Sequence, residues 1–244
     1  MRPVTLGVLV CDSVKPELQA IAGDYREMFE QLFRDHSPDG FHVNLRHYDV
    51  RIGQYPQQLD ECDGYLTTGS AASVNDDEPW INALIRFIRR LQDEQVKLFA
   101  VCFGHQLLAK ALGGRVAIAD QGWGVGMHEA TVSQQEPWMS PAADSYRLIS
   151  SHKEQVVELP SGAVVLASTP HCPHAMIRCG SLIGVQGHPE FRAPYAEALM
   201  GTRPAIIPEQ TRKEATESFR VGKPDHSLLT AWIVNSVVLG ESSS

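Results

Sequence analysis

The chain has 244 residues, of which 43% are apolar and 20% are charged, and it carries a formal net charge of −8 at neutral pH. This composition is typical of a globular protein with one large core, and we expect a single domain over residues 1–244. Nucleic acids and anionic membranes attract clusters of Lys and Arg, so an acidic chain without a basic run argues against both as partners.

The N-terminal apolar run at residues 4–10 is too short to span a membrane, and no small-residue cleavage site follows it. It therefore predicts a buried strand. The chain also contains five cysteines, an odd number without paired spacing, which favours a reducing compartment; we expect the cytoplasm. These are Cys11, Cys62, Cys102, Cys172 and Cys179.

Strand patterns and helix patterns alternate along the chain. Such alternation is typical of a parallel sheet covered by helices on both faces. We therefore predict an α/β fold, a flavodoxin-like three-layer sandwich with a mostly parallel central sheet and a small antiparallel annex. The predicted strands are residues 4–10, 42–48, 64–68, 97–101, 163–167 and 182–187.

Two helices are predicted in the first half of the chain. Residues 25–34 carry five large apolar side chains on one helical face. The second helix begins at Asp77-Glu78-Pro79, because proline and acidic residues suit the first helical turn. Its apolar stripe and its arginine-rich opposite side indicate a helix that packs on the core and faces solvent.

The strand at residues 64–68 ends in Gly69-Ser70. Glycine at this position allows the backbone to approach a ligand closely, so the turn is a candidate donor of backbone amides. An ordinary strand-to-loop turn has the same pattern, and by itself the signal is weak.

Cys102 lies where the apolar run at residues 97–101 turns directly into a helix that ends at Gly113-Gly114. Such a turn lifts the side chain above the sheet and leaves unpaired amides beside it. These amides and the positive end of the helix dipole favour the thiolate, the form that attacks a carbonyl carbon. The N–H of Phe103 is then available to the developing oxyanion. Taken alone, Cys102 is equally compatible with a buried apolar cysteine.

Residues 115–150 predict a meander of short strands, the antiparallel annex. Further along, His171, Cys172 and His174 lie near Cys179. Their spacing matches no common tetrahedral zinc pattern, so we expect no metal site there.

His188 lies at the carboxyl end of the last predicted strand, and Glu190 follows after a restricting proline. The carboxylate could hold one ring nitrogen while the other faces a thiol, as in a catalytic triad. A loop with a surface histidine has the same local pattern. The presence of Cys102 in the same chain favours the triad.

Residues 192–222 form a long connection with three prolines and a polar helix candidate at 209–219. Long connections near a site are often lids or partner surfaces. A C-terminal helix over about 225–239 is predicted to pack on the core, and the Ser242–Ser244 tail is predicted to be disordered.

Four segments, in their order and spacing, resemble the class I glutamine amidotransferase domain over nearly the whole chain. Within that family the likeness is to free-standing members similar to the amidotransferase part of GMP synthetase and to plant γ-glutamyl peptidases. The segments are the elbow at 102–106, the Gln-Gly-His-Pro-Glu-Phe box at 186–191, the Thr-Gly-Ser loop at 68–70 and the segment at 151–156; the subgroup likeness rests on 69–81, Gly122-Trp123 and Gly126.

The resemblance implies Cys102 as nucleophile, His188 as general base and acid, and Glu190 as its orienting carboxylate. It also implies an oxyanion region and contacts to the substrate's glutamyl end. The oxyanion residues would be Gly69, Ser70 and Phe103, and the substrate contacts would be Gln106, Ser151 and His152. A structural, hydrogen-bonded role for His152 is about equally compatible with the sequence.

Two positions depart from the family pattern. Ala100 stands where the elbow usually has glycine, a minor change if its backbone dihedrals are ordinary. The loop reads Gly69-Ser70-Ala71-Ala72, where synthetase-linked members commonly carry two glycines and a proline. The altered loop predicts a different pocket wall and a preferred substrate other than free glutamine.

We therefore predict a cysteine-dependent hydrolase of γ-glutamyl amide bonds that works through a glutamyl thioester, without a metal or organic cofactor. A stand-alone hydrolase of γ-glutamyl peptides or amines is favoured, because no synthase domain is recognisable. One alternative is a glutaminase subunit that supplies ammonia to a separate synthase partner. Another is a non-catalytic binding or regulatory module on the same fold. A further alternative with the same thiol is a dienelactone-type α/β-hydrolase. Such an enzyme would place its acid before its histidine, whereas Glu190 follows His188.

Overall fold

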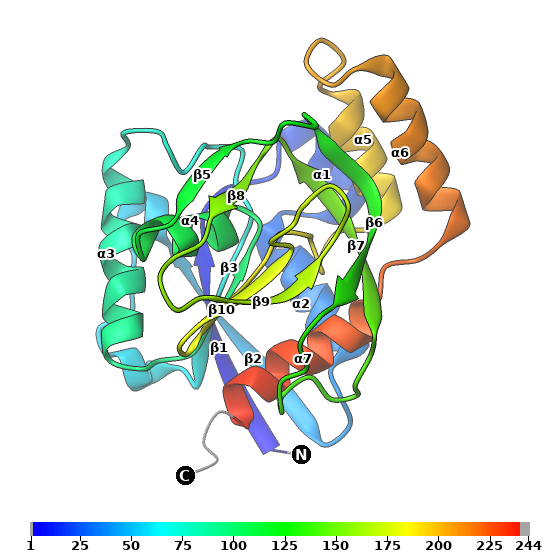
Figure 1. Ribbon diagram of the computed structural model, residues 1–244. Coiled ribbons are helices and arrows are strands. Elements are labelled where there is room, and N and C mark those ends of the chain that lie inside the picture. Colours follow the sequence, from blue (N-terminus) through cyan, green and yellow to red (C-terminus); the bar gives the residue numbers. More distant parts are fainter. Residues whose placement is uncertain (1, 240–244) are drawn as a thin grey trace.

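A nine-stranded sheet runs through the computed structural model, which describes residues 2–239 (Figure 1). Five neighbouring strands are parallel, and the remaining four continue the sheet antiparallel. The parallel strands, in sheet order, are β2 (Phe41–Asp49), β1 (Arg2–Val10), β3 (Gly64–Thr67), β4 (Leu98–Val101) and β11 (Leu182–Val185). The antiparallel strands are β10 (Met176–Cys179), β9 (Val164–Ser168), β6 (Gly124–Val132) and β7 (Ser145–His152). A separate two-stranded sheet pairs β5 (Arg115–Ile118) with β8 (Glu154–Glu158).

Helices cover both faces of the sheet, and each face has its own apolar core. Side chains alternate along β1, so that Leu6 and Val8 join one core while Leu9 joins the other. The first core includes residues of α2 (Tyr25–His36) and α7 (His226–Val238), and the second includes residues of α3 (Pro79–Asp93) and α4 (Phe103–Ala111). The predicted α/β sandwich is thereby confirmed.

Local signals explain where the helices begin. The Asp24 side chain caps α2, and the Glu27 carboxylate accepts a hydrogen bond from the Asp24 backbone N–H, which forms a capping box. Three further helices carry proline in their first turn, where its missing N–H costs nothing. They are α1 (Pro16–Ala22), α3 and α5 (Ala193–Gly201). Short 3-10 turns lie at Val50–Ile52 and Leu59–Glu61.

The sequence prediction for residues 115–150 was right about antiparallel pairing and wrong about short strands. β6 and β7 have nine and eight residues and pair along almost their whole length. They extend the central sheet through β9, and only β5 of this stretch belongs to the separate small sheet. Burial of one side of β6 and β7 against the first core accounts for their length.

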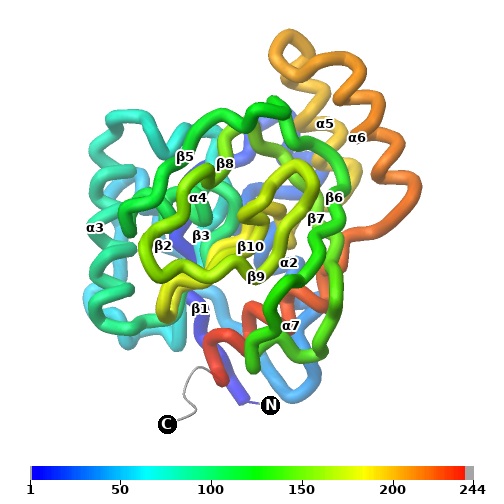
Figure 2. Tube along the Cα trace, viewed as in Figure 1, coloured from blue at the N-terminus to red at the C-terminus, as the bar shows by residue number. Residues whose placement is uncertain are grey.

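The connection predicted at residues 192–222 contains two helices, α5 and α6 (Glu209–Val221). The polar helix was predicted, but α5 was missed because Pro194 was interpreted as a loop residue. Figures 1 and 2 show α5 and α6 side by side next to β6 and β7. Ser218 of α6 accepts a hydrogen bond from the Met127 backbone, which ties the helix to β6.

The organisation of the chain as one domain stays a prediction, and the Ser242–Ser244 tail lies outside the described residues. Among residues 2–239, no helix combines the length and apolar character required to cross a membrane.

Candidate active site

Strand register places the predicted nucleophile and the predicted base at one edge of the sheet. β4 and β11 are parallel neighbours, with Val101 opposite Val185. The Cys102 amide donates to the Val185 carbonyl at 2.8 Å, which continues the pairing past the end of both strands. His188 follows three residues after Val185, so the two side chains leave the sheet next to each other.

Cys102 has an uncommon backbone conformation, with φ of 49° and ψ of −99°, directly before the first residue of α4. A left-handed φ is costly for a residue with a Cβ and is typical of nucleophiles held on a sharp strand-to-helix turn. Gly104 is required two residues later, because a Cβ there would collide with the Thr67 side chain. Ala100 is not one of the positive-φ residues, so its methyl group fits an ordinary strand conformation.

Cys102, His188 and Glu190 form a hydrogen-bonded series. The Nδ1 of His188 lies 2.8 Å from Oε1 of Glu190, and the ring also has a side-chain hydrogen bond with Cys102. Both the imidazole and the carboxylate are buried. The Phe191 ring stacks on the imidazole at 3.8 Å between centroids and 6° between planes, which fixes the orientation of the ring. This geometry suits proton transfer between the thiol and an oriented imidazole.

The charge state of His188 follows from its neighbours. Burial lowers the pKa of His188, but the negative charges of Cys102 and Glu190 and the hydrogen bonds to both outweigh it and raise the pKa to about 10. The imidazole is therefore protonated at neutral pH, and it can give its proton to a leaving amine.

The other cysteines differ from Cys102 in their surroundings. Burial raises the pKa of Cys11 and of Cys172 to about 12 and that of Cys179 to about 11, and it also raises the pKa of Cys62. These four stay protonated thiols, which are poor nucleophiles. Cys102 is the cysteine that borders the large cavity described next.

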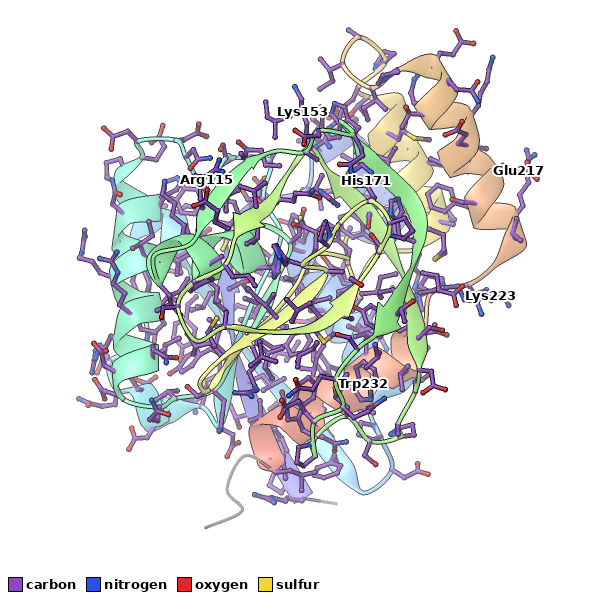
Figure 3. All side chains as sticks on the ribbon, viewed as in Figure 1. Arg115, Lys153, His171, Glu217, Lys223 and Trp232 are labelled. Carbon is purple, nitrogen blue, oxygen red and sulfur yellow. The ribbon has the colours of Figure 1, made fainter. Side chains whose placement is uncertain are left out.

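A cavity of about 610 Å³ opens above Cys102. Its walls come from the loop after β3, the start of α4, the β7–β8 turn and the segment between α5 and α6; Lys153, labelled in Figure 3, lies at that β7–β8 turn. The volume lies within the usual range for small-molecule sites, roughly 300–1,000 Å³. The lining side chains include three cations and one carboxylate, Lys15, Lys153, Arg203 and Glu154.

The predicted oxyanion residues lie around Cys102 in different ways. Phe103 and Ser70 line the cavity, and the Phe103 amide, as the first of α4, has no intrahelical partner. Gly69 instead lies against the imidazole, because a Cβ there would approach Cε1 of His188 to 2.7 Å. Asp12 holds the loop by accepting from the Ala71 amide at 2.7 Å.

The predicted substrate contacts, Gln106, Ser151 and His152, all line the cavity. His152 Nδ1 lies 3.0 Å from the Glu154 carbonyl, and burial lowers the pKa of His152 to about 3, so the ring is neutral and Nδ1 carries the proton. Gln106 is less free than expected, because its side-chain N–H groups already donate to protein acceptors.

Sequence reasoning missed two groups at this site. Gln186 is buried, and its side-chain amide lies 3.5 Å from the Cys102 sulfur. Arg203 reaches the cavity from the end of α5, with its guanidinium 5.6 Å from the Trp123 ring centroid and 3.4 Å from the Ser151 hydroxyl. Gln186 lies at the carboxyl end of a predicted strand, as Cys102 does, and this shared position was a usable signal for Gln186. No sequence pattern pointed to Arg203.

The rings of His128, His152 and His171 lie close together. Among residues 2–239, no group of three or more His, Cys, Asp or Glu side chains could hold a metal ion. His171 instead packs edge-on against His128 and His152, with ring centroids 5.6 and 5.5 Å away.

Comparisons with known proteins agree with this geometry. The family model "Glutamine amidotransferase class-I" matches residues 24–200. Gamma-glutamyl peptidase 3 of Arabidopsis thaliana is 31% identical over 236 residues, which cover 91% of each chain. One subunit of the glutamine-hydrolyzing GMP synthase of Halobacterium salinarum is 31% identical over 173 residues, covering 69% of this chain and 84% of that protein.

The fold has solved counterparts as well. A crystal structure of a glutamine amidotransferase from Thermotoga maritima superposes with a TM-score of 0.70 at 20% sequence identity. The match covers 95% of this chain and 98% of the other. At this identity the likeness concerns the fold alone.

Proposed function

This chain belongs to the class I glutamine amidotransferase family and is an amide hydrolase, and we propose that it cleaves γ-glutamyl amide bonds with Cys102 as nucleophile. The observation that carries the proposal is the hydrogen-bonded series of Cys102, His188 and Glu190 beside a large cavity. A buried imidazolium next to a cysteine sulfur suits attack on an amide, which must lose a basic amine.

The first half of the reaction forms a thioester. The Cys102 thiolate attacks the γ-carbonyl carbon, and the carbonyl oxygen becomes an oxyanion that accepts from the Phe103 amide and from the loop at Gly69-Ser70. The C–N bond then breaks, and His188 gives its proton to the departing amine. Glu190 holds the ring in the orientation that both steps need.

The second half regenerates the enzyme. Neutral His188 takes a proton from water as the water oxygen attacks the thioester carbonyl. The C–S bond breaks, glutamate leaves, and the thiolate is again paired with an imidazolium. No metal or organic cofactor takes part in this scheme.

The preferred substrates in this proposal are γ-glutamyl peptides or amines, hydrolysed by the chain alone. The cavity is large for an amino acid alone, and its wall includes Arg203, a cation suited to a substrate carboxylate. The similarity to a γ-glutamyl peptidase over 91% of both chains supports the same choice. We place the enzyme in the cytoplasm, where a nucleophilic thiol stays reduced.

A glutaminase subunit that passes ammonia to a synthase is the second candidate. The observation in its favour is the 31% identity to the GMP synthase subunit of Halobacterium salinarum. The altered loop at Gly69-Ser70-Ala71-Ala72, which borders the cavity, argues for the first candidate.

The test is turnover by the purified protein alone. We expect release of amine from γ-glutamyl peptides and γ-glutamyl alkylamines, slow hydrolysis of glutamine, and no product from the Cys102→Ala variant. Rapid hydrolysis of glutamine without turnover of the larger amides would favour the glutaminase subunit. Absence of turnover on every substrate would reject the hydrolase, and turnover by Cys102→Ala equal to wild type would reject the nucleophile.

A further inference from the structure

Gln186 lies beside the nucleophile for the same reason as His188. The parallel register that sets Val101 opposite Val185 brings the next residues, Cys102 and Gln186, side by side. Gln186 is only 1% exposed, and its Nε2 donates to the Cys102 sulfur at 3.5 Å. The amide thus touches the reacting atom from inside the protein.

The direction of the Gln186 amide is fixed by a second buried glutamine. Gln106 Nε2 donates to the backbone carbonyl of Glu154 at 2.7 Å and to Oε1 of Gln186 at 3.2 Å. A backbone carbonyl can only accept, so the nitrogen of Gln106 must face it. Gln106 then offers its second N–H to Gln186, whose oxygen faces Gln106 and whose N–H₂ group faces the sulfur.

We propose that Gln186 is a catalytic residue that stabilises the Cys102 thiolate, and that Gln106 is its positioning residue. A thiolate in this arrangement has two donors, the imidazolium of His188 and the amide of Gln186. Hydrogen bonds to a charged acceptor are about twice as strong as neutral ones, and burial strengthens them further.

The amide acts when charge returns to sulfur. The sulfur loses its negative charge as the S–C bond forms, and it regains the charge when water has attacked the thioester and the S–C bond breaks. A donor already aimed at sulfur stabilises this leaving thiolate. Gln186 therefore lowers the barrier to hydrolysis of the thioester, and its loss should lower kcat more than it changes KM.

Three titratable groups interact with the Cys102 sulfur, and of these His188 is the charged partner. They are His188 after β11, Tyr25 of α2 and Cys172 after β9, which all interact electrostatically with Cys102. Burial raises the pKa of Tyr25 well above its ordinary value and that of Cys172 to about 12. Both stay neutral in the range where alkylation is measured.

The test follows alkylation of Cys102 by iodoacetamide as a function of pH, with peptide mass spectrometry as readout. Met has nearly the shape of Gln without the donor, so Gln186→Met should move the midpoint of the alkylation profile upward by about one pH unit. Gln106→Met should move it less, in the same direction. Gln155→Met is the matched control, because Gln155 is also buried but does not border the cavity, and it should leave the midpoint in place.

An unchanged midpoint in folded Gln186→Met would overturn the proposal. If that variant does not fold, Gln186→Glu replaces it, since the carboxylate keeps the shape, removes the donor and adds a negative charge. It should move the midpoint further upward, and an unchanged or lower midpoint would overturn the proposal. The inference rests on the proposed nucleophile, but the alkylation test needs no substrate. If the wild-type protein hydrolyses none of the substrates, the proposed function is rejected, and the alkylation midpoints still test the role of Gln186.

Discussion

The two halves of the central sheet contribute differently to the candidate site. The parallel half ends in Cys102 and in the turn that carries His188, whose positions follow from backbone register and whose side chains are buried. The antiparallel half and the segment between α5 and α6 supply partly exposed wall residues such as Ser151 and Arg203. The candidate reacting groups therefore lie at the edge of the parallel half, whereas much of the cavity wall comes from other parts of the fold. Changes in the first should abolish chemistry, and changes in the second should alter substrate preference.

Glu190→Gln should have the largest effect on turnover. The amide keeps the size of the side chain but cannot hold the imidazolium by charge, and it can favour the wrong ring tautomer. We expect kcat to fall by about 10³-fold with little change in KM. Steady-state kinetics on a γ-glutamyl peptide measure this, and a loss below tenfold would contradict an orienting role.

Gly104→Ala should destabilise the parallel half of the sheet, because it disturbs the packing of α4 on β3. The new Cβ would collide with Thr67 of β3, so β3 and α4 must separate. We expect a loss of about 1–3 kcal/mol in the free energy of unfolding, measured by urea denaturation. Gly201→Ala is the matched control, because nothing lies within 4 Å of a Cβ there, and it should be neutral or slightly stabilising.

The pH dependence should follow His188 because its pKa is raised to about 10. Activity should fall about tenfold per pH unit above that value, as the imidazolium loses the proton it gives to the amine. The same shift stabilises the folded state fully below about pH 6.5, the ordinary value, and the contribution is lost as pH rises through about 10. Melting temperatures of wild type and His188→Gln should therefore converge at alkaline pH; a gap that persists above pH 10 would contradict this.

Arg203→Gln should have the smallest effect, and we expect it to act on substrate binding at the cavity wall. We expect KM for a carboxylate-bearing γ-glutamyl peptide to rise about tenfold with kcat nearly unchanged. Arg220→Gln removes the same charge from α6 at an exposed pair with Glu217, and it serves as control for long-range attraction. Equal effects of both variants would indicate general electrostatic attraction, and an unchanged KM in Arg203→Gln would exclude a contact with the substrate.

The fold and the neighbouring positions of the candidate reacting residues were predictable because short sequence patterns determine them. Cys102 and His188 each follow an apolar run, and carboxyl ends of parallel strands meet at one edge of a sheet. Their roles remain proposals, but their proximity is a consequence of register.

The rest depends on contacts between distant residues. α5 was missed because Pro194 indicates either a loop or a first helical turn, and only packing on the core decides between them. The direction of the Gln186 amide depends on the Glu154 carbonyl through Gln106, and Gln106 and Glu154 are 48 residues apart in the chain. Arg203 reaches the cavity only because α5 returns the chain to it.

With Cys102 as the proposed nucleophile, its left-handed backbone makes catalysis and stability opposing demands at one position. A non-glycine residue in such a conformation costs about 1–3 kcal/mol, which the surrounding strands and helix must outweigh. Mutation to glycine would relieve that strain while removing the thiol. Under the proposed mechanism, selection for thermal stability alone would therefore favour glycine at position 102, whereas selection for turnover would retain the cysteine.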